Sequence, residues 1–354
     1  MTKVVPGPPP GQSVFVGLDV SRSTWTFNVR WDGAERRRWS TPSELRHLMA
    51  LVTEYQACAL HVAYEACGFG YEIAWALRAQ GVPVTVVAPS TVERAPGRHV
   101  KTDRVDARLL AEKLERGALK AVWIPTRADH ERRQLSRTYA QVVTDRKRAQ
   151  ARLRALLQEH GRLGPHPRAG WPAYAAWLGA EALPGPVQTC VAELLGLRQQ
   201  AAQSAQRLRA ALLRVAADPA YAPLVQAVCQ QPGIGALTAI RVRLELGEMR
   251  RFHTADSLAH YLGLTPSEYS SGDVVQRGHL VKCGPGAVRA WLVQCAWASI
   301  RGPHADTRLR DTFHRLCPRP SDRNRAIIAV TRRLALRLRA RWLASLPPAT
   351  SQAA

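Results

Sequence analysis

Four acidic residues in the first third of the chain have positions that suit metal-dependent chemistry. Asp19 ends the apolar run 13–20 in VGLDVSRST, and Glu65 ends a second strand-like run in HVAYEACG. Asp103 and Asp106 are three residues apart in KTDRVDARLLAEKL, so both are expected on one face of a helix. Carboxylates that meet in a folded chain repel one another unless cations neutralise them. The set therefore predicts a site for two Mg2+ ions about 4 Å apart, which would promote phosphodiester cleavage.

Each part of this set also has a simpler interpretation. Asp19 in GLDVS resembles the start of an actin-like ATPase domain, although no second glycine-rich phosphate loop is evident. Glu65 alone could be a charge at a helix N-terminus, and a DxxD pair is common on solvated helices. Lys101 and Arg104 either face a phosphate or are solvated charges at the helix start. The order strand-Asp, strand-Glu, helix-DxxD favours the metal site.

A possible nucleophile lies in the segment 261–284, which is rich in small, turn-forming and basic residues. Ser271 precedes two cationic residues, Arg277 and Lys282, and such a serine could attack a phosphate. Loop serines more often bond to their own backbone. Ser270 is the neighbour that a shift of one position would select instead. From the residues alone, the nucleophile is the less favoured interpretation.

The segment QPGIGALTA at 231–239 is typical of a helix-hairpin-helix. Gly233 and Gly235 would let the backbone approach a phosphate, and the helix that follows offers free N–H groups. Contacts of this kind recognise the nucleic-acid backbone and not its bases. The alternative is a structural turn between two packed helices.

These candidate residues need elements that position them. Alternating and apolar patterns predict strands at 13–20, 24–30, 36–41, 57–65 and 82–87, and helices at 70–80 and 102–116. Thr41, Pro42 and Glu44 predict a helix start with a capping box. Three strands followed by alternating helices and strands is the order of a ribonuclease-H-like α/β domain, predicted at 13–125.

Beyond residue 125 the sequence becomes helical. Two long helical patterns flank a proline-rich segment and predict a basic helical hairpin, or coiled coil, over 126–217. Short helices with several glycines then predict a helical C-terminal domain at 218–345, which carries the helix-hairpin-helix and the serine loop. The expected fold class is therefore α/β plus all-α.

The charge of the chain indicates a polyanionic partner. Fifty Lys and Arg against 27 Asp and Glu give a formal net charge of +23. Such an excess repels itself unless a polyanion such as nucleic acid neutralises it. A solubilising surface, or a GC-rich genome that favours arginine, would also account for it. Residues 127–168 hold eleven Lys and Arg against four Asp and Glu, so Arg146, Lys147 and Arg148 are predicted nucleic-acid contacts.

The cysteines and the hydropathy of the chain narrow the class of protein further. The seven cysteines are scattered and form no CxxC pair, which argues against a disulfide framework or a zinc site. The N-terminus lacks the apolar core of a signal peptide. The longest uncharged stretch, between Asp218 and Arg241, is broken by Pro232-Gly233. We expect a cytoplasmic, nucleoid-associated protein without membrane spans.

Three motifs in the first third resemble a known family. GLDVS at 17–21, YEACG at 64–68 and KTDRVDARLLA at 101–111 look like the signatures of the DEDD insertion-sequence transposases, whose N-terminal domain is similar to the RuvC Holliday-junction resolvase. GLTPSEYSSG at 263–272, followed by a basic stretch, resembles their second signature module. The resemblance spans about residues 13–300 and is loose through 127–217.

The resemblance implies a specific activity. Ser271 would be the nucleophile, and the four carboxylates would hold the metal ions. Lys282 would match the lysine of the basic stretch, although Cys283 stands where a small or basic residue is common. The family further implies a homo-oligomeric recombinase, a dimer or tetramer, that a structured non-coding bridge RNA guides on donor and target DNA. A hydrolytic RuvC-like resolvase and a non-catalytic nucleic-acid-binding protein remain the alternatives.

Overall fold

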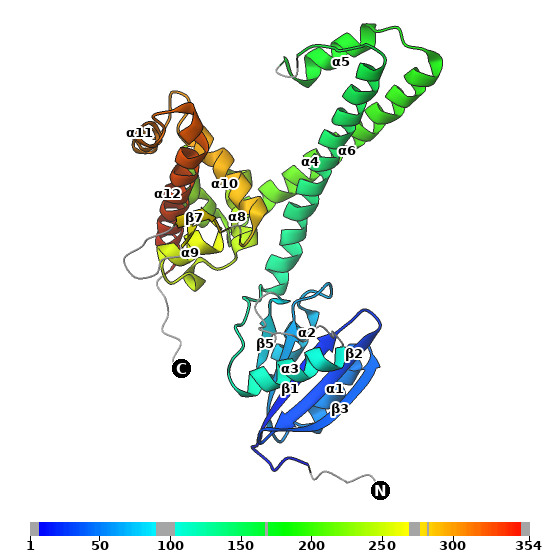
Figure 1. Cartoon of the computed structure of the whole chain (residues 1–354), viewed down its shortest axis with the longest axis vertical. Helices are drawn as coiled ribbons and strands as arrows, with labels where there is room; N and C mark the ends of the chain where they lie inside the picture. Colours follow the sequence, from blue (N-terminus) through cyan, green and yellow to red (C-terminus); the bar gives the residue numbers. More distant parts are fainter. Residues whose placement is uncertain (1–6, 90–102, 167–168, 269–276, 282, 348–354) are drawn as a thin grey trace. The chain divides into compact units, whose positions relative to one another are not determined.

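The computed structural model of the chain describes residues 7–89, 103–166, 169–268, 277–281 and 283–347. The chain divides into two compact units, Met1–Arg127 and Ala128–Ala354 (Figure 1). Each unit has a hydrophobic core of its own, as is usual for a domain. No helix in the described ranges is long and apolar enough to cross a membrane.

The first unit contains a mixed five-stranded sheet. Its strands are β1 (Ser13–Val20), β2 (Thr24–Trp31), β3 (Ala34–Pro42), β4 (Ala59–Glu65) and β5 (Val84–Val87), in the order β3-β2-β1-β4-β5. The first three strands are antiparallel, whereas β1, β4 and β5 are parallel. Asp32 and Gly33, both at positive φ, form the tight turn between β2 and β3. The predicted α/β class is confirmed, and the topology is consistent with a ribonuclease-H-like domain.

Helices cover both faces of this sheet (Figure 1). They are α1 (Leu45–Glu54), α2 (Glu72–Ala79) and α3 (Asp103–Glu115). Val16 and Leu18 of β1 are fully buried in one core with α1 and α2. Because side chains alternate along a strand, Gly17 and Asp19 face the opposite side. The helix α3 packs on that side, against β1 and β2.

One predicted boundary is wrong. Thr41 and Pro42 do not begin a helix, because β3 continues through Pro42 and pairs there with Thr24 of β2. Proline is tolerated at this position because β3 is an edge strand and Pro42 is its last residue. The helix α1 begins at Leu45, with Glu44 as an N-cap that makes no side-chain hydrogen bond.

The second unit consists mainly of helices. They are α4 (Arg127–Glu159), α5 (Gly170–Ala180), α6 (Gly185–Ala217), α7 (Ala222–Cys229), α8 (Ala236–Leu246), α9 (Ala255–Tyr261), α10 (Gly286–Ser299), α11 (Thr307–Leu316) and α12 (Arg323–Ala344). The helical character predicted on both sides of the proline-rich segment is confirmed by α4 and α6. A short antiparallel hairpin, β6 (Pro266–Glu268) and β7 (Arg277–Leu280), was not predicted, because strands this short leave no visible alternation.

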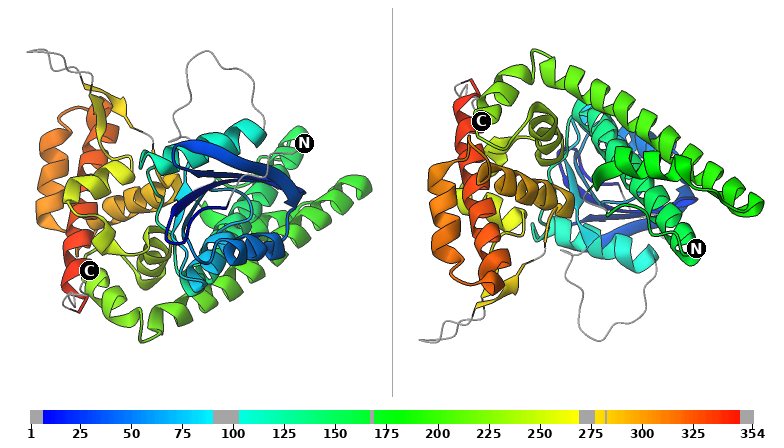
Figure 2. Two further views of the ribbon diagram at one scale, coloured as in Figure 1. Left: turned by 90° about the horizontal axis from the view of Figure 1, so that it is seen from below. Right: turned by 90° about the horizontal axis from the view of Figure 1, so that it is seen from above.

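The outer parts of α4 and α6 lie side by side, with α5 beside them (Figure 1). Their small core joins Leu153 and Leu157 of α4, Tyr174 of α5 and Val191 of α6. The larger core of the unit is formed by the C-terminal helices, of which α10 and α11 both lie against α12 (Figure 2).

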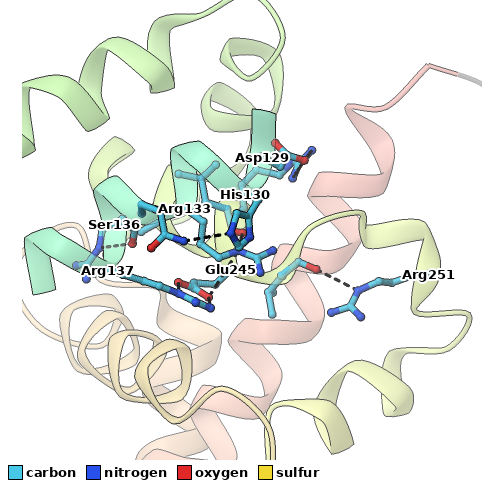
Figure 3. A network of polar contacts seen from close by, with 12 residues as sticks. Asp129, His130, Arg133, Ser136, Arg137, Glu245 and Arg251 are labelled. Atoms are coloured by element: carbon cyan, nitrogen blue, oxygen red, sulfur yellow. Dashed lines mark hydrogen bonds and ion pairs between the residues drawn. The ribbon is translucent and has the colours of Figure 1, made fainter. Parts of the chain in front are cut away.

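A polar network joins the first turns of α4 to the C-terminal helices (Figure 3). Asp129 is 5% exposed and accepts hydrogen bonds from the Tyr221 hydroxyl at 2.5 Å and from Arg243 at 3.2 Å. Glu245 of α8 accepts two hydrogen bonds from Arg137, at 3.0 and 3.1 Å. Removing one partner of such a network would leave a buried charge uncompensated. The beginning of α4 is therefore firmly attached to this core.

Candidate active site

Two of the predicted carboxylates end neighbouring strands in the same register. The parallel pairing of β1 and β4 runs up to Leu18 opposite Tyr64, so Asp19 and Glu65 follow side by side on one face of the sheet. Both residues are half-buried. Burial raises the pKa of the Cys67 thiol, and the negative charges of Asp19 and Glu65 raise it further. The ends of β1 and β4 therefore bring Asp19 and Glu65 together.

Gly17 places the helix α3 against the same face. A Cβ atom at Gly17 would lie 2.0 Å from the Ala107 carbonyl oxygen and 2.5 Å from the Ala111 backbone nitrogen. No other residue fits at this position without moving the helix. Gly17 and Asp19 are two residues apart, so α3 packs on the face that carries Asp19.

The direction of α3 follows from an ion pair at its other end. Glu115 accepts a hydrogen bond from Arg30 Nε at 2.9 Å, and Arg30 is paired with Phe15 near the start of β1. The helix therefore runs antiparallel to β1. Its first turn, which contains Asp103 and Asp106, lies toward the end of β1 where Asp19 is found. The backbone thus directs all four predicted positions to one end of the sheet.

The donor set suits a hard divalent cation, because magnesium prefers carboxylate oxygens. Asp106 is half-buried, whereas the side chain of Asp103 lies outside the described part of the structure. Among the side chains that are described, no group of three or more His, Cys, Asp or Glu is placed to hold a metal ion. Asp19, Glu65 and Asp106 by themselves are therefore not arranged as a metal site, and the assignment of all four carboxylates as ligands stays a prediction.

Sequence reasoning missed a row of polar residues beside this site. Thr26 lies opposite Asp19 and is 3.0 Å from the Ser40 hydroxyl, while Asn28 lies opposite Gly17. Asn28 is fully buried, and neither its amide nitrogen nor its amide oxygen has a hydrogen-bond partner among the described residues. The only signal in the sequence is the polar alternation in TWTFNVRW, which marks a polar face without assigning it a role.

The buried amide of Asn28 leads to a stability prediction. An unsatisfied buried polar group costs about 1–3 kcal/mol, so Asn28→Leu is expected to raise the free energy of unfolding by about that amount. Asn28→Asp has nearly the same shape and should instead destabilise the unit, because it buries a charge. Chemical denaturation of the two variants and the wild type measures both effects. A clear loss of stability in Asn28→Leu would mean that the amide is satisfied, for example by a buried water.

Of the second predicted site, the structure describes only the flanking residues. Ser271 and Lys282 lie outside the described residues, and of Arg277 only the backbone is described, at the start of β7. The chain that contains Ser271 connects β6 to β7. Gly263 and Gly284 have positive φ, and a Cβ at Gly284 would lie 1.7 Å from the Tyr261 carbonyl oxygen. Close packing therefore explains Gly263 and Gly284.

The predicted helix-hairpin-helix corresponds to α7, a turn, and α8. Gly233 has φ +86°, and a Cβ there would lie 2.5 Å from the Ser299 backbone nitrogen. Packing against α10 thus accounts for Gly233 without a phosphate. Gly235 is the N-cap of α8, and no atom lies within 4 Å of the position its Cβ would take. Of the two glycines, only Gly235 leaves room for a ligand.

The predicted basic contacts of α4 differ in their surroundings. Lys147 and Arg148 are exposed, and Arg148 is 3.4 Å from Asp145. Arg146 is half-buried and close to Arg198 of α6, whose pKa is lowered by burial and by the Arg146 charge. Positive charge from both helices therefore gathers on this part of the hairpin.

Comparison with known proteins defines the class. A family model described as a transposase with a DEDD domain matches residues 16–161, and a model of the IS116/IS110/IS902 transposase family matches residues 225–312. The first matched region contains the four carboxylates and the second contains Ser271, so each candidate site lies in a region that matches transposases.

Several curated relatives are similar over most of their length. The protein y4qE of Sinorhizobium fredii is 29% identical over 304 residues, which cover 84% of this chain and 74% of the relative. The transposase for insertion sequence element IS1111A of Coxiella burnetii is 27% identical, covering 76% and 74%. The transposase for element IS1328 of Yersinia enterocolitica is 26% identical, covering 79% and 82%. The chain belongs to the DEDD insertion-sequence transposases of the IS116/IS110/IS902 family. Membership implies DNA substrates and a divalent metal ion.

Proposed function

We propose that this transposase cleaves and rejoins DNA strands with Mg2+ held by Asp19, Glu65, Asp103 and Asp106 and with Ser271 as the nucleophile. The observation that carries the proposal is the convergence of β1, β4 and α3 at one end of the sheet. Asp19 and Glu65 end adjacent strands, and the packing of Gly17 on α3 brings the first turn of that helix to the same end. The domains at 13–125, 126–217 and 218–345 would contribute the metal site, the basic hairpin and the serine loop.

The chemistry divides between the two sites. The Ser271 oxygen forms a bond to phosphorus while the bond from phosphorus to the leaving DNA oxygen breaks. The serine loses its proton, and the leaving oxygen takes one up. The carboxylates orient the phosphate, and Mg2+ when bound supplies positive charge that stabilises the transition state. In the reverse reaction a DNA hydroxyl attacks the phosphoserine, which rejoins the strand.

The proposal includes partners that the family resemblance implies. A structured non-coding RNA would guide the protein to donor and target DNA, and a homo-oligomer would bring two or more copies together. Arg146, Lys147, Arg148, Arg277 and Lys282 supply positive charge for these nucleic acids. Gly235, the N-cap of α8, would place backbone N–H groups near a phosphate, whereas Gly233 is closely packed against α10.

A cleavage assay tests the proposal against its two rivals. Labelled DNA that carries an element end is incubated with the protein and Mg2+, or with EDTA, and separated by denaturing electrophoresis before and after protease treatment. A protease-sensitive, magnesium-dependent adduct supports the proposal. Free cleaved ends alone would favour a RuvC-like resolvase, and no magnesium-dependent cleavage would favour a binding protein without catalysis.

The basic hairpin is expected to contribute strongly to nucleic-acid affinity. Replacing Arg146, Lys147 and Arg148 with Ala should weaken binding and flatten its dependence on salt, by up to about 0.9 in log–log slope for each phosphate that the variant no longer neutralises. Fluorescence anisotropy at several KCl concentrations measures both quantities. An unchanged slope would show that these three residues are an ordinary solvated surface.

A further inference from the structure

The C-terminal helices form an open cleft that none of the residues predicted as catalytic or nucleic-acid-binding lines. It lies between the N-terminal end of α11, the C-terminal half of α12 and the turn after α7, and its volume is about 620 Å³. The helices α11 and α12 pack against each other (Figure 2). The charged and amide side chains of its lining belong to Gln231, Asp306, Arg308, Arg337 and Arg341. Three arginines therefore share the cleft with a single carboxylate.

The negative charge of Asp306 is neutralised within the cleft. One carboxylate oxygen caps α11 by accepting the backbone N–H of Leu309 at 3.0 Å. The other accepts hydrogen bonds from the buried Gln231 amide at 3.0 Å and from Arg337. Burial alone would raise the pKa of Asp306, but these hydrogen bonds and the Arg337 charge lower it below the usual value. Asp306 therefore stays ionised, and its charge is matched by Arg337.

The other two arginines keep their charge available. Arg308 is exposed on the first turn of α11. Arg341 donates a hydrogen bond at 2.8 Å to Gln230 Oε1, which carries no charge. Within the described ranges, neither arginine forms an ion pair. Subtracting the Asp306–Arg337 pair from three arginines and one aspartate leaves two positive charges.

The arrangement presents these charges in a definite geometry. Arg337 and Arg341 are four residues apart on α12, which is about 6 Å along a helix. Gln231 and the Asp306–Arg337 pair hold one side of the cleft in place, so little ordering is needed when a ligand binds. Arg308 faces the same cleft from α11, whose N-terminal dipole also favours an anion.

We propose that this cleft binds the phosphodiester backbone of DNA, with Arg308 and Arg341 as the contacting residues. A planar guanidinium can donate two hydrogen bonds to one phosphate, which makes arginine well suited to this ligand. Contacts of this kind position the DNA without selecting a sequence. The inference rests on the proposed function, in which DNA is the substrate, and adds two contacting residues that are not among those assigned above.

A double variant with a matched control tests the cleft. Arg308→Ala/Arg341→Ala removes two charges from α11 and α12 inside the cleft. Arg315→Ala/Arg325→Ala removes two exposed charges from the same helices outside it. For duplex DNA, the log–log slope of affinity against KCl should fall by up to about 1.8 in the cleft variant and clearly less in the control. Arg308→Lys/Arg341→Lys should retain most of the wild-type slope, and thermal melts verify that each variant is folded.

Several outcomes would overturn the cleft proposal. The proposal is wrong if the slope is unchanged in the folded cleft variant, or if the slope decreases equally in the control pair. It is also wrong if the slope decreases only with a structured RNA. Failure of the proposed function gives a different result, namely wild-type protein with no magnesium-dependent DNA cleavage. If the wild type cleaves DNA and the cleft variant binds DNA with the wild-type salt dependence, only the cleft proposal is contradicted.

Discussion

Strand cleavage is expected to fall by more than about 100-fold when any one of the four carboxylates loses its charge. The variants are Asp19→Asn, Glu65→Gln, Asp103→Asn and Asp106→Asn. Even residues that merely orient metal ligands cost about 10- to 100-fold when they are replaced, and the loss of a ligand itself should cost more. DNA affinity should change little, because these substitutions leave the basic surface intact. Cleavage of labelled DNA and anisotropy binding are measured side by side.

Asp32→Asn is the matched control for these variants. Asp32 lies at the turn between β2 and β3 with φ 52°, a conformation that asparagine also tolerates, so the same chemical change occurs in the same unit away from the site. It should retain wild-type cleavage. Full activity in two of the four carboxylate variants would contradict the metal site. Titration of Mg2+ followed by thermal shift gives a second measurement, since the variants should lose the stabilisation that the wild type gains on binding the ion.

Local patterns in the sequence were sufficient to predict most elements of the first unit. The strand β1 has the predicted bounds, since its apolar run ends at a polar residue and a turn. The helix start at Thr41 was wrong because pairing of β3 with β2 outweighs a local capping signal. The register of β1 with β4 could not be predicted, because it joins strands that are about 40 residues apart in the chain. That register is nevertheless what places Glu65 beside Asp19.

The residues of the candidate sites also differ in whether the sequence alone could identify them. Strand ends and a DxxD spacing are visible in a sequence, so Asp19 and Glu65 could be proposed without a structure. Asn28 could not, because an asparagine in a strand acquires meaning only when its amide is seen to be buried under a helix. Arg308 and Arg341 belong to a segment so rich in arginine that sequence alone does not distinguish them from their neighbours. Only the pairing of Asp306 with Arg337 shows which charges remain available.

Ser271→Ala is expected to eliminate both the covalent protein–DNA adduct and the recombinant product. Replacing a catalytic nucleophile costs on the order of 10⁶ in rate, so no product should be detectable. A phosphoserine intermediate keeps the energy of the broken bond for rejoining, whereas hydrolysis would dissipate it. The variant should still bind DNA, because it retains the carboxylates and every arginine. Denaturing electrophoresis of labelled DNA after incubation with Mg2+ detects the adduct.

Ser270→Ala separates the nucleophile from its neighbour. It removes the same hydroxyl one position earlier in the connection between β6 and β7, so it should disturb this segment as much as Ser271→Ala and yet retain activity. A protease-sensitive adduct that persists in Ser271→Ala would show that the nucleophile lies elsewhere. Loss of the adduct in Ser270→Ala, with Ser271→Ala active, would move the assignment to Ser270. Asp19→Asn should also form no adduct, because serine attack requires the phosphate charge to be stabilised by the metal held at the carboxylates.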